Sequence, residues 1–374
     1  MNTDIETYLS NWQPQSVEST RSFPAEMYFD DRIYRLEQER IFGRQWLYAG
    51  HTSQLTEPGS YLTVEIAEQP LLIVRDLQNH LRGFFNVCTH RGGPVASGCG
   101  QSSHFTCLYH AWTFGLEGEL KAAPYMQGAA GFDHQDYGLR PIRVETWGPL
   151  IFVNFDLQCE PLATQLGNLP EQYTRYNLSA LKQVHSEHYE IDVNWKLYVE
   201  NSSESYHVAM VHPALELFRT VNDLELNICQ STYSEYLPFL PHSDSIKYGF
   251  EPGLAIAGLN EKEMQGSEIT LLYPNFAIVF SPTFVMARMI SPCGVSKTQI
   301  RFDWMVPDTP EATAAENVAA VVSLYDRTVK EDLEMLKRVH VGVRSLHYTP
   351  GRLSPVLEIG THHFQQLVME QICS

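Results

Sequence analysis

Two short segments of the sequence each carry one cysteine and one histidine, and they constrain the fold more than any other feature. The segments are Cys88-Thr89-His90 and Cys107-Leu108-Tyr109-His110. Thiolates and imidazoles are typical ligands of transition metals. The 16 residues between the segments, 91–106, include four glycines and one proline, which favour tight turns. We therefore expect two loops that face each other across one metal centre.

The ligand types distinguish two candidate metal centres. A Rieske [2Fe–2S] cluster has two cysteines on one iron and two histidines on the other. A zinc site with the same four residues usually pairs cysteine with cysteine and histidine with histidine. Each segment here mixes the two residue types, so the sequence favours the iron–sulfur cluster and leaves zinc as the alternative. Cys99 matches no ligand position and is interpreted as structural.

The length of the chain and the distribution of its β-like and helical segments predict two domains. A chain of 374 residues exceeds the usual size of one hydrophobic core. Short β-like runs separated by turn residues predict a small all-β domain between about 60 and 156. Later strands are expected at 269–280, 283–291 and 298–306, and helices at 26–46 and 311–338. The predicted fold is α+β, with the cluster domain at 45–157 and a larger domain at 1–44 and 158–374.

Charge and cysteine content limit the partners. The net charge of −18 argues against nucleic acid and anionic membranes, since phosphate binding needs a basic surface. The N-terminal residues lack the basic and apolar parts of a signal peptide, and no apolar run reaches the roughly 18 residues that span a bilayer. The seven scattered cysteines do not have the pattern of a disulfide framework. We therefore expect a cytoplasmic protein with no membrane or nucleic-acid partner.

A second pair of histidines, His207 and His212, follows two acidic residues. On a helix, Glu200, Glu204 and His207 would share one face. His212 would lie about 140° away from His207, so both imidazoles reach one ion only if the helix is distorted or ends between them. Pro213 marks the expected end of that helix.

Two histidines and one carboxylate form the facial triad that leaves open positions on Fe(II) for O₂ and substrate. Asp332 is the candidate carboxylate, because it lies within about 40° of the centre of the apolar stripe on the expected helix 311–338. That stripe consists of Val318, Val322, Tyr325, Val329 and Leu336. Glu331 and Glu334 are expected to point elsewhere. A buried carboxylate needs a metal or a partner, so a buried Asp–Arg pair is the alternative.

The motif Cys88-x-His90-Arg91 … Cys107-x₂-His110-x-Trp112 resembles the signature of Rieske non-haem iron oxygenases, and the similarity covers nearly the whole chain. The resemblance implies a [2Fe–2S] cluster on Cys88, His90, Cys107 and His110, with Trp112 packed against it. It also implies a mononuclear Fe(II) on His207, His212 and Asp332, since the family places its third ligand in a Glu-Asp pair such as Glu331-Asp332.

The same resemblance assigns roles to residues beside the second histidine pair. Glu204 corresponds to the family's bridging carboxylate, which joins an iron-ligand histidine to a cluster-ligand histidine. The family most often has Asp at this position, and a solvated helix glutamate is the alternative for Glu204. Asn201 would lie near the open side of the iron and contact substrate or O₂. Glu200 and Tyr206 would support the ligands from outside.

The resemblance further implies the fold and the partners. The larger domain would be a catalytic domain of the helix-grip fold, an antiparallel sheet with long helices, and the chain would form a homotrimer. Electrons would come from NAD(P)H through a separate flavin-containing, ferredoxin-type reductase. The sequence itself has neither a Cys-x₄-Cys-x₂-Cys spacing nor a convincing Gly-x-Gly-x-x-Gly segment. O₂ would be the co-substrate.

The C-terminal segments 348–353 and 360–364, together with Glu204, resemble the choline, carnitine and glycine-betaine oxygenases. We therefore expect hydroxylation, or oxidative N-demethylation with C–N cleavage, of a small quaternary ammonium compound. The candidates for an aromatic cage are Tyr273, Phe276, Phe280 and Phe284, although aromatic residues in strands more often fill cores. The alternative substrate is a small aromatic acid or ring.

Two other functional classes stay open. A non-catalytic Rieske electron carrier would share the first motif but has no reason to possess a second metal site. A ligand-binding helix-grip module with a structural metal would consume no oxygen.

Overall fold

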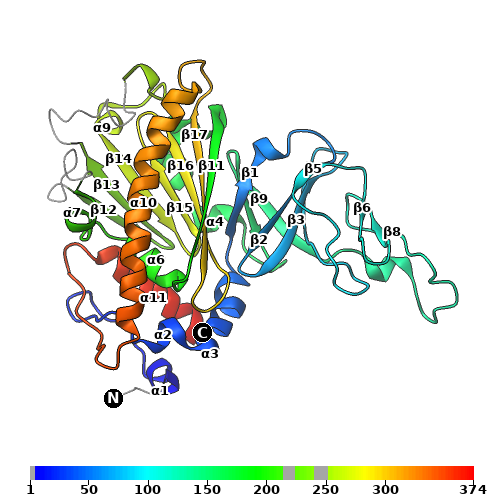
Figure 1. Ribbon diagram of the computed structural model, residues 1–374, viewed down its shortest axis with the longest axis horizontal. Helices are drawn as coiled ribbons and strands as arrows, with labels where there is room; N and C mark the ends of the chain where they lie inside the picture. Colours follow the sequence, from blue (N-terminus) through cyan, green and yellow to red (C-terminus); the bar gives the residue numbers. More distant parts are fainter. Residues whose placement is uncertain (1–4, 214–223, 240–251) are drawn as a thin grey trace. The chain divides into compact units, whose positions relative to one another are not determined.

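The computed structural model describes residues 5–213, 224–239 and 252–374. The chain divides into two compact units (Figure 1). One unit is continuous, Phe42–Thr164, and the other joins Met1–Ile41 to Gln165–Ser374. We call Phe42–Thr164 the inserted unit and the two-segment unit the enclosing unit.

The inserted unit is all-β, as the short runs predicted. Its main sheet has seven antiparallel strands in the order β1-β10-β9-β4-β3-β2-β5. They are β1 (Leu47–His51), β10 (Leu150–Asn154), β9 (Pro141–Trp147), β4 (Leu81–Phe85), β3 (Gln69–Arg75), β2 (Ser60–Ile66) and β5 (Cys99–Gln101). A smaller sheet contains β6 (Phe105–Thr106), β7 (Thr113–Phe114) and β8 (Leu120–Ala122). One cysteine–histidine segment lies in the loop after β4, and the other lies between β6 and β7.

The enclosing unit is built on a second antiparallel sheet of seven strands, in the order β11-β17-β16-β15-β14-β13-β12. They are β11 (Leu181–Ile191), β17 (Thr298–Pro307), β16 (Val285–Pro292), β15 (Phe276–Phe280), β14 (Gly266–Leu272), β13 (Thr232–Pro238) and β12 (Glu225–Cys229). Side chains on both faces of the central strands are buried, so both faces must be covered.

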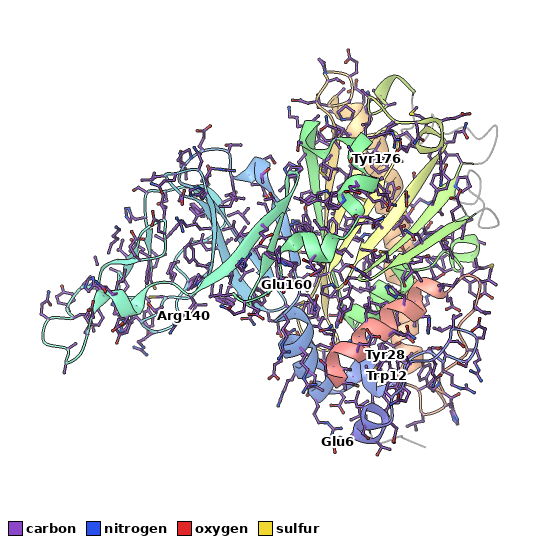
Figure 2. All side chains as sticks on the ribbon, turned by 180° about the vertical axis from the view of Figure 1, so that it is seen from behind. Glu6, Trp12, Tyr28, Arg140, Glu160 and Tyr176 are labelled. Carbon is purple, nitrogen blue, oxygen red and sulfur yellow. The ribbon has the colours of Figure 1, made fainter. Side chains whose placement is uncertain are left out.

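Helices cover one face of this sheet, and residues 165–180, a run of short helical turns that we call the irregular segment, cover the other. Figure 1 shows α10 (Ala315–Val343) along the first face. Helix α6 (Trp195–Ser202) packs against α10, and α11 (Ile359–Cys373) packs against α6. On the opposite face, seen from behind in Figure 2, the rings of Tyr173 and Tyr176 pack on Phe280 at centroid distances of 3.7 and 4.8 Å. An α+β fold with an antiparallel sheet and long helices was predicted and is confirmed.

The remaining helices in the described ranges are short. No helix in these ranges combines the length and the apolar character needed to cross a membrane. They are α1 (Ile5–Ser10), α2 (Glu26–Phe29), α3 (Asp31–Glu37), α4 (Leu162–Leu166), α5 (Leu169–Gln172), α7 (Val208–Val211) and α9 (Glu261–Met264).

Three expected elements were wrong in detail. The single strand expected at 269–280 is the hairpin β14–β15, because residues 273–275, with Pro274 at their centre, turn the chain. The helix expected at 26–46 breaks after α2, where the side chain of Asp30 accepts a hydrogen bond from the Arg32 amide at 2.8 Å and starts α3. The last long helix starts at Ala315 and ends at Val343, later than expected at both ends.

A buried ion pair fixes the N-terminal helices to α6. Glu37 at the end of α3 contacts the ammonium group of Lys196, and both side chains are 0% exposed. The indole Nε1 of Trp195 donates to the other oxygen of Glu37 at 2.8 Å. Burial lowers the pKa of Lys196, and Glu37 opposes this shift. Removing one partner of such a pair would leave an uncompensated charge, so the pair specifies where α6 lies.

Candidate metal centres

The cysteine–histidine loops of the inserted unit converge as their spacing predicted. Cys88 and Cys107 are 3% and 2% exposed, and local backbone hydrogen bonds fix both loops. The Cys88 amide donates to the Gly93 carbonyl at 2.8 Å, and the Cys107 amide donates to the Trp112 carbonyl at 2.9 Å. The two loops approach closely at Gly93, where a Cβ atom would stand 3.0 Å from the Sγ of Cys107. A side chain at this position would have to displace the Cys107 thiol by a few tenths of an ångström, so glycine suits the close approach.

The two imidazoles of these loops face each other, with ring centroids 4.7 Å apart. Trp112 stacks on His90 at 4.8 Å and an interplanar angle of 9°. The Nδ1 atom of His90 is buried and has no hydrogen-bond partner in the described part of the chain. Burial raises the pKa of the Cys88 thiol, and the adjacent Cys107 thiol raises it further. Two neighbouring thiols and a buried nitrogen without a partner are the donor set that a [2Fe–2S] cluster would satisfy.

The loop between β6 and β7 has an exposed tip. His110 lies at the solvent-facing edge, and its neighbours Leu108 and Tyr109 are 97% and 58% exposed. Two large, exposed side chains beside an exposed histidine make this tip a candidate for contact with another protein.

In the enclosing unit, the helix expected to run through both histidines is interrupted. Helix α6 ends at Ser202, and the Oγ of Ser203 donates to the Glu200 carbonyl at 2.8 Å. The Glu204 carboxylate then accepts hydrogen bonds from the amides of Tyr206 and His207, which turns the chain. The short helix α7 starts directly after His207 and ends directly before His212. The break therefore lies before His207, whereas we expected a helix that is distorted or ends between the two histidines, with Pro213 marking its end.

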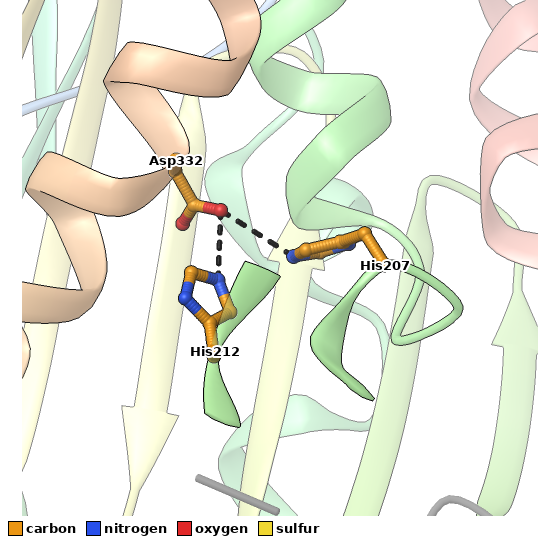
Figure 3. Close-up of side chains that lie close together, drawn as sticks. All are labelled: His207, His212 and Asp332. Atoms are coloured by element: carbon orange, nitrogen blue, oxygen red, sulfur yellow. Dashed lines mark hydrogen bonds and ion pairs between the residues drawn. The ribbon is translucent and has the colours of Figure 1, made fainter. Parts of the chain in front are cut away.

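The turn brings both imidazoles to the carboxylate of Asp332 on α10 (Figure 3). The Oδ1 atom of Asp332 lies 3.4 Å from the Nε2 of His207 and 2.8 Å from the Nε2 of His212. One donor atom from each residue lies within 4.8 Å of the other two. Metal–nitrogen and metal–oxygen bonds are about 2.0–2.2 Å long, so a single ion fits between these atoms. Two nitrogens and one carboxylate on one side of an ion leave its other side open.

A second carboxylate holds each imidazole from behind. The Oε1 of Glu204 lies 2.6 Å from the Nδ1 of His207, and the Oε2 of Glu331 lies 2.9 Å from the Nδ1 of His212. Carboxylates at Nδ1 keep the proton there and leave the Nε2 lone pair for a metal. The expectation that Glu331 points away was wrong, because it is only one residue from Asp332 and its longer side chain reaches back. The Nε of Arg327 donates to its other oxygen at 3.1 Å.

The protonation of the triad reflects this crowding of carboxylates. Burial would raise the pKa of Asp332, but hydrogen bonds from the two imidazoles hold it well below its usual range. Burial would lower the pKa of His207, yet Asp332 and Glu204 outweigh it and raise the pKa to about 10. The pKa of His212 is raised for the same reason, by Asp332 and Glu331. A metal ion would therefore take the place of protons at this site.

The other residues expected at the site differ in their surroundings. Asn201 lies partly exposed near the end of α6, and Tyr206 is 58% exposed. Glu200 accepts hydrogen bonds from the Oη of Tyr28 at 2.9 and 3.0 Å and from the Nε2 of Gln365 at 2.9 Å. Burial raises the pKa of Glu200 to about 7. Glu200 therefore joins α6 to α2 and α11.

The four aromatic residues considered for a cage, Tyr273, Phe276, Phe280 and Phe284, are all buried. Phe280 lies on the face covered by Tyr173, away from the helices that carry the triad. The ring of Phe284 packs edge-on against Tyr325 of α10. Phe280 therefore belongs to the core between the sheet and the irregular segment.

One buried carboxylate near the triad was missed. Glu235 on β13 is 2% exposed and accepts a hydrogen bond from the Oη of Tyr233 at 3.1 Å. Burial raises its pKa to about 6, while the hydroxyl of Ser205 opposes the shift and the charge of Glu204 adds to it. A glutamate inside a strand of buried residues was the signal, but strand periodicity alone does not tell which face it occupies.

Comparisons with known proteins agree with this geometry. A family model described as ring hydroxylating alpha subunit (catalytic domain) matches residues 178–374, and one described as Rieske [2Fe-2S] domain matches residues 45–139. Choline monooxygenase of Arabidopsis thaliana, described as chloroplastic, is 28% identical over 384 aligned positions, which cover 98% of this chain and 86% of that protein. The glycine betaine monooxygenase oxygenase subunit of Pseudomonas aeruginosa is 26% identical over 391 positions, covering 96% and 90%.

Solved structures share the fold over nearly the full length. The quaternary ammonium Rieske monooxygenase CntA, solved with its substrate L-carnitine, aligns with a TM-score of 0.81 and 24% identity over 97% of both chains. Naphthalene 1,2-dioxygenase from Rhodococcus sp., solved with indole, aligns with a TM-score of 0.75 and 23% identity over 94% of both chains.

Proposed function

Because the chain belongs to the Rieske ring-hydroxylating oxygenase alpha-subunit family, we propose that it is the oxygenase component that oxidises a small quaternary ammonium compound with O₂. The family has a [2Fe–2S] cluster and a mononuclear non-haem iron. We assign the cluster to Cys88, His90, Cys107 and His110, and the iron to His207, His212 and Asp332.

The observation that carries the proposal is the convergence of two imidazole Nε2 atoms on one carboxylate, with each Nδ1 held by a further carboxylate. A Rieske electron carrier needs no such site, so the triad favours an oxygenase over a carrier. A structural metal would be enclosed by four protein ligands, whereas three ligands on one side leave room for O₂ and substrate.

Relatives and charge both support a cationic substrate. Several relatives are named for choline or glycine betaine, and the solved relative CntA for a quaternary ammonium compound. Four carboxylates lie at or close to the triad, on Glu204, Glu235, Glu331 and Asp332. These carboxylates make the electrostatic potential beside the triad more negative, which favours a cation over an anionic aromatic acid.

Each residue of the site then has a physical task. When bound, the cluster supplies single electrons and the iron activates O₂ beside the substrate. Asp332 supplies the negative charge that retains a divalent cation, and Glu204 and Glu331 keep both imidazoles in the tautomer that can bind it. The break between α6 and α7 presents His207 and His212 on one side of the ion, and Asn201 is the candidate for contact with substrate or O₂.

The remaining partners follow from the family. The oxygenase component requires a separate reductase, for which a flavin-containing, ferredoxin-type protein using NAD(P)H is the proposal. A homotrimer is proposed as the assembly. A cytoplasmic location stays a prediction, since the plant relatives are described as chloroplastic.

Metal analysis and oxygen uptake test the proposal. Protein purified without oxygen should be brown and contain about three irons and two acid-labile sulfides per chain. With a family reductase, oxygen uptake should be faster with glycine betaine, carnitine or choline than with benzoate. A colourless protein that contains zinc would contradict the family chemistry. Faster uptake with benzoate would contradict only the substrate class.

A further inference from the structure

Arg288 is a charged residue in the centre of the sheet of the enclosing unit. It lies on β16, opposite Phe302 of β17 and Ala277 of β15. Every other residue of β16 is buried, and Arg288 alone in that strand keeps partial access to solvent. A strand flanked on both sides can offer such access only where the layer that covers it leaves space. The guanidinium of Arg288 lies on the face of the sheet that α6 covers, because it contacts Tyr198 and Ser202 of that helix.

The guanidinium is held in place by two rings and a hydroxyl. Its carbon lies 4.9 Å from the centroid of Phe302 and 5.8 Å from that of Tyr198 on α6. The Nη1 atom donates to the Oγ of Ser202, the last residue of α6, at 3.0 Å. Aromatic faces and one hydrogen bond orient a planar guanidinium without neutralising it.

No carboxylate of the described residues forms an ion pair with Arg288, and its Nε atom has no hydrogen-bond partner there. A cation enclosed in protein without a counter-charge is expensive, because the energy of transfer from water is not recovered. The Nε and Nη2 atoms of a guanidinium form one edge, and this edge can bind both oxygens of a carboxylate. Arg288 is thus an oriented cation whose remaining edge lacks a counter-ion.

Arg288 also belongs to the surroundings of the triad. Ser202, which it contacts, comes five residues before His207. Burial raises the pKa of Tyr198 to about 12, with the charge of Arg288 opposing the rise and that of Asp332 adding to it, so Tyr198 is close to both. Glu235 lies beside Ser205, three residues further along the same segment. One positive and one negative side chain therefore flank the segment that leads to His207.

We propose that Arg288 binds a carboxylate of the substrate, so that the substrate is a betaine-type or carnitine-type zwitterion and not choline. The inference rests on the proposed function, which it narrows from quaternary ammonium compounds in general to those that carry an acid group. The carboxylate binds Arg288, and the ammonium group lies toward the triad, which carries the carboxylate of Asp332. The charges of such a substrate match those of the site at both ends.

Oxygen uptake by the full chain with a family reductase tests this assignment. The wild type should have a higher kcat/KM for glycine betaine than for choline or for trimethylglycine amide, which has the same shape without the negative charge. In Arg288→Gln, KM for glycine betaine should rise about 10- to 150-fold, the range for one lost charge-assisted hydrogen-bonded contact, while kcat/KM for choline changes little. Arg288→Lys should recover part of the loss, because it keeps the charge without the planar edge. Arg338→Gln, an exposed arginine on α10, is the matched control and should change neither value.

The possible outcomes separate the two proposals. Equal losses for glycine betaine and choline in Arg288→Gln would overturn the carboxylate site and make Arg288 a structural residue. If that variant does not fold or binds no iron, the wild type decides, since equal kcat/KM for glycine betaine and its amide would also overturn it. If no ammonium compound is oxidised but benzoate is, and the benzoate activity needs Arg288, the proposed substrate class fails while the carboxylate site is supported.

Discussion

The imidazoles of His207 and His212 are each oriented by a glutamate, and both converge on one aspartate. His207 is held by Glu204 and His212 by Glu331, while Asp332 faces both Nε2 atoms. At the scale of single residues, the site therefore consists of two carboxylate–imidazole pairs around a shared carboxylate. Each member can be removed separately, which makes its contribution measurable.

Replacing Asp332 with Ala should reduce the mononuclear iron to less than about a tenth of the wild-type content, because it removes one of three ligands and the main compensating charge. The spectrum of the cluster should stay unchanged. Iron analysis and electron paramagnetic resonance measure the two centres independently. Glu334→Ala is the control, since Glu334 is exposed on the same helix and forms its ion pair with Arg338. Full iron content in Asp332→Ala would move the third-ligand role to another carboxylate.

Replacing Glu331 with Gln should weaken Fe(II) binding about 10- to 100-fold, because the amide holds the Nδ1 proton of His212 less strongly than a carboxylate does. Anaerobic titration of iron-free protein with Fe(II) gives the affinity directly. Glu334→Gln is the matched control on the same helix. Unchanged affinity would mean that Glu331 contacts His212 without supporting the metal.

The sequence was informative about residues where spacing has a geometric meaning. The mixed Cys/His spacing predicted two facing loops, and the position of Asp332 near an apolar stripe predicted that it faces inward. The structure brings these side chains together, and their binding of metal stays a prediction. The roles of Glu331, Glu235 and Arg288 were missed because helix and strand periodicity gives only the direction in which the Cα–Cβ bond leaves the backbone. Long charged side chains reach around a helix, and a charged residue in a strand can face either side.

At the scale of elements, the start of α11 sets the position of the turn that leads to His207. Gly360 lies in the first turn of α11, where a Cβ atom would collide with the carbonyl of Ser203 and the ring of Tyr233. The hydroxyl groups of Thr361 and Ser203 lie 3.2 Å apart. A helix packed this closely against a backbone carbonyl fixes the chain just before Glu204.

Replacing Gly360 with Ala should lower the free energy of unfolding of the enclosing unit by about 1–3 kcal/mol, because the backbone of Ser203 must move. Gly342→Ala is the matched control near the end of α10, since nothing lies within 4 Å of its added Cβ. That change should raise the free energy of unfolding by about 0.4–1 kcal/mol, as alanine restricts the unfolded chain. Urea unfolding followed by near-ultraviolet circular dichroism compares the two variants. Equal stability of both variants would rule out close packing at Gly360.

Elements with a regular pattern could be predicted, and those that depend on local side-chain bonds could not. The strands β16 and β17 and the helix α10 were expected close to their observed places, because long apolar patterns define them. The break after Ser202 depends on hydrogen bonds from Ser203 and to Glu204, which compete with the helix ladder. The break after Asp30 has the same origin.

At the scale of the whole molecule, the exposed edge around His110 suits contact with another subunit, as the proposed trimer requires. Cys107→Ala should keep an iron site but lose the cluster, and His207→Ala should do the reverse. Neither alone should turn over, but co-expressed chains should regain oxygen uptake if electrons cross between subunits. Two affinity tags must first establish that mixed oligomers form. Verified mixed oligomers without activity would exclude the inter-subunit route.

Glu204 can be tested in the same mixture. Glu204→Gln in the chain that carries Cys107→Ala should abolish the recovered activity while iron content stays near that of the parent variant. Loss of the iron itself would instead limit Glu204 to holding His207, the contact that the structure describes.

The enclosing unit is assembled from two segments on either side of the inserted unit, and this has a consequence for biosynthesis. The Nη1 of Arg40 donates to the carbonyl of Ile372 at 2.6 Å, and that of Arg21 donates to the carbonyl of Pro350 at 2.9 Å. These partners are 332 and 329 residues apart, so both contacts form only after Ile372 and Pro350 have left the ribosome. The inserted unit is continuous and complete once Thr164 has emerged. It is therefore free to fold and take up its cluster while the polypeptide that will hold the iron is still being made.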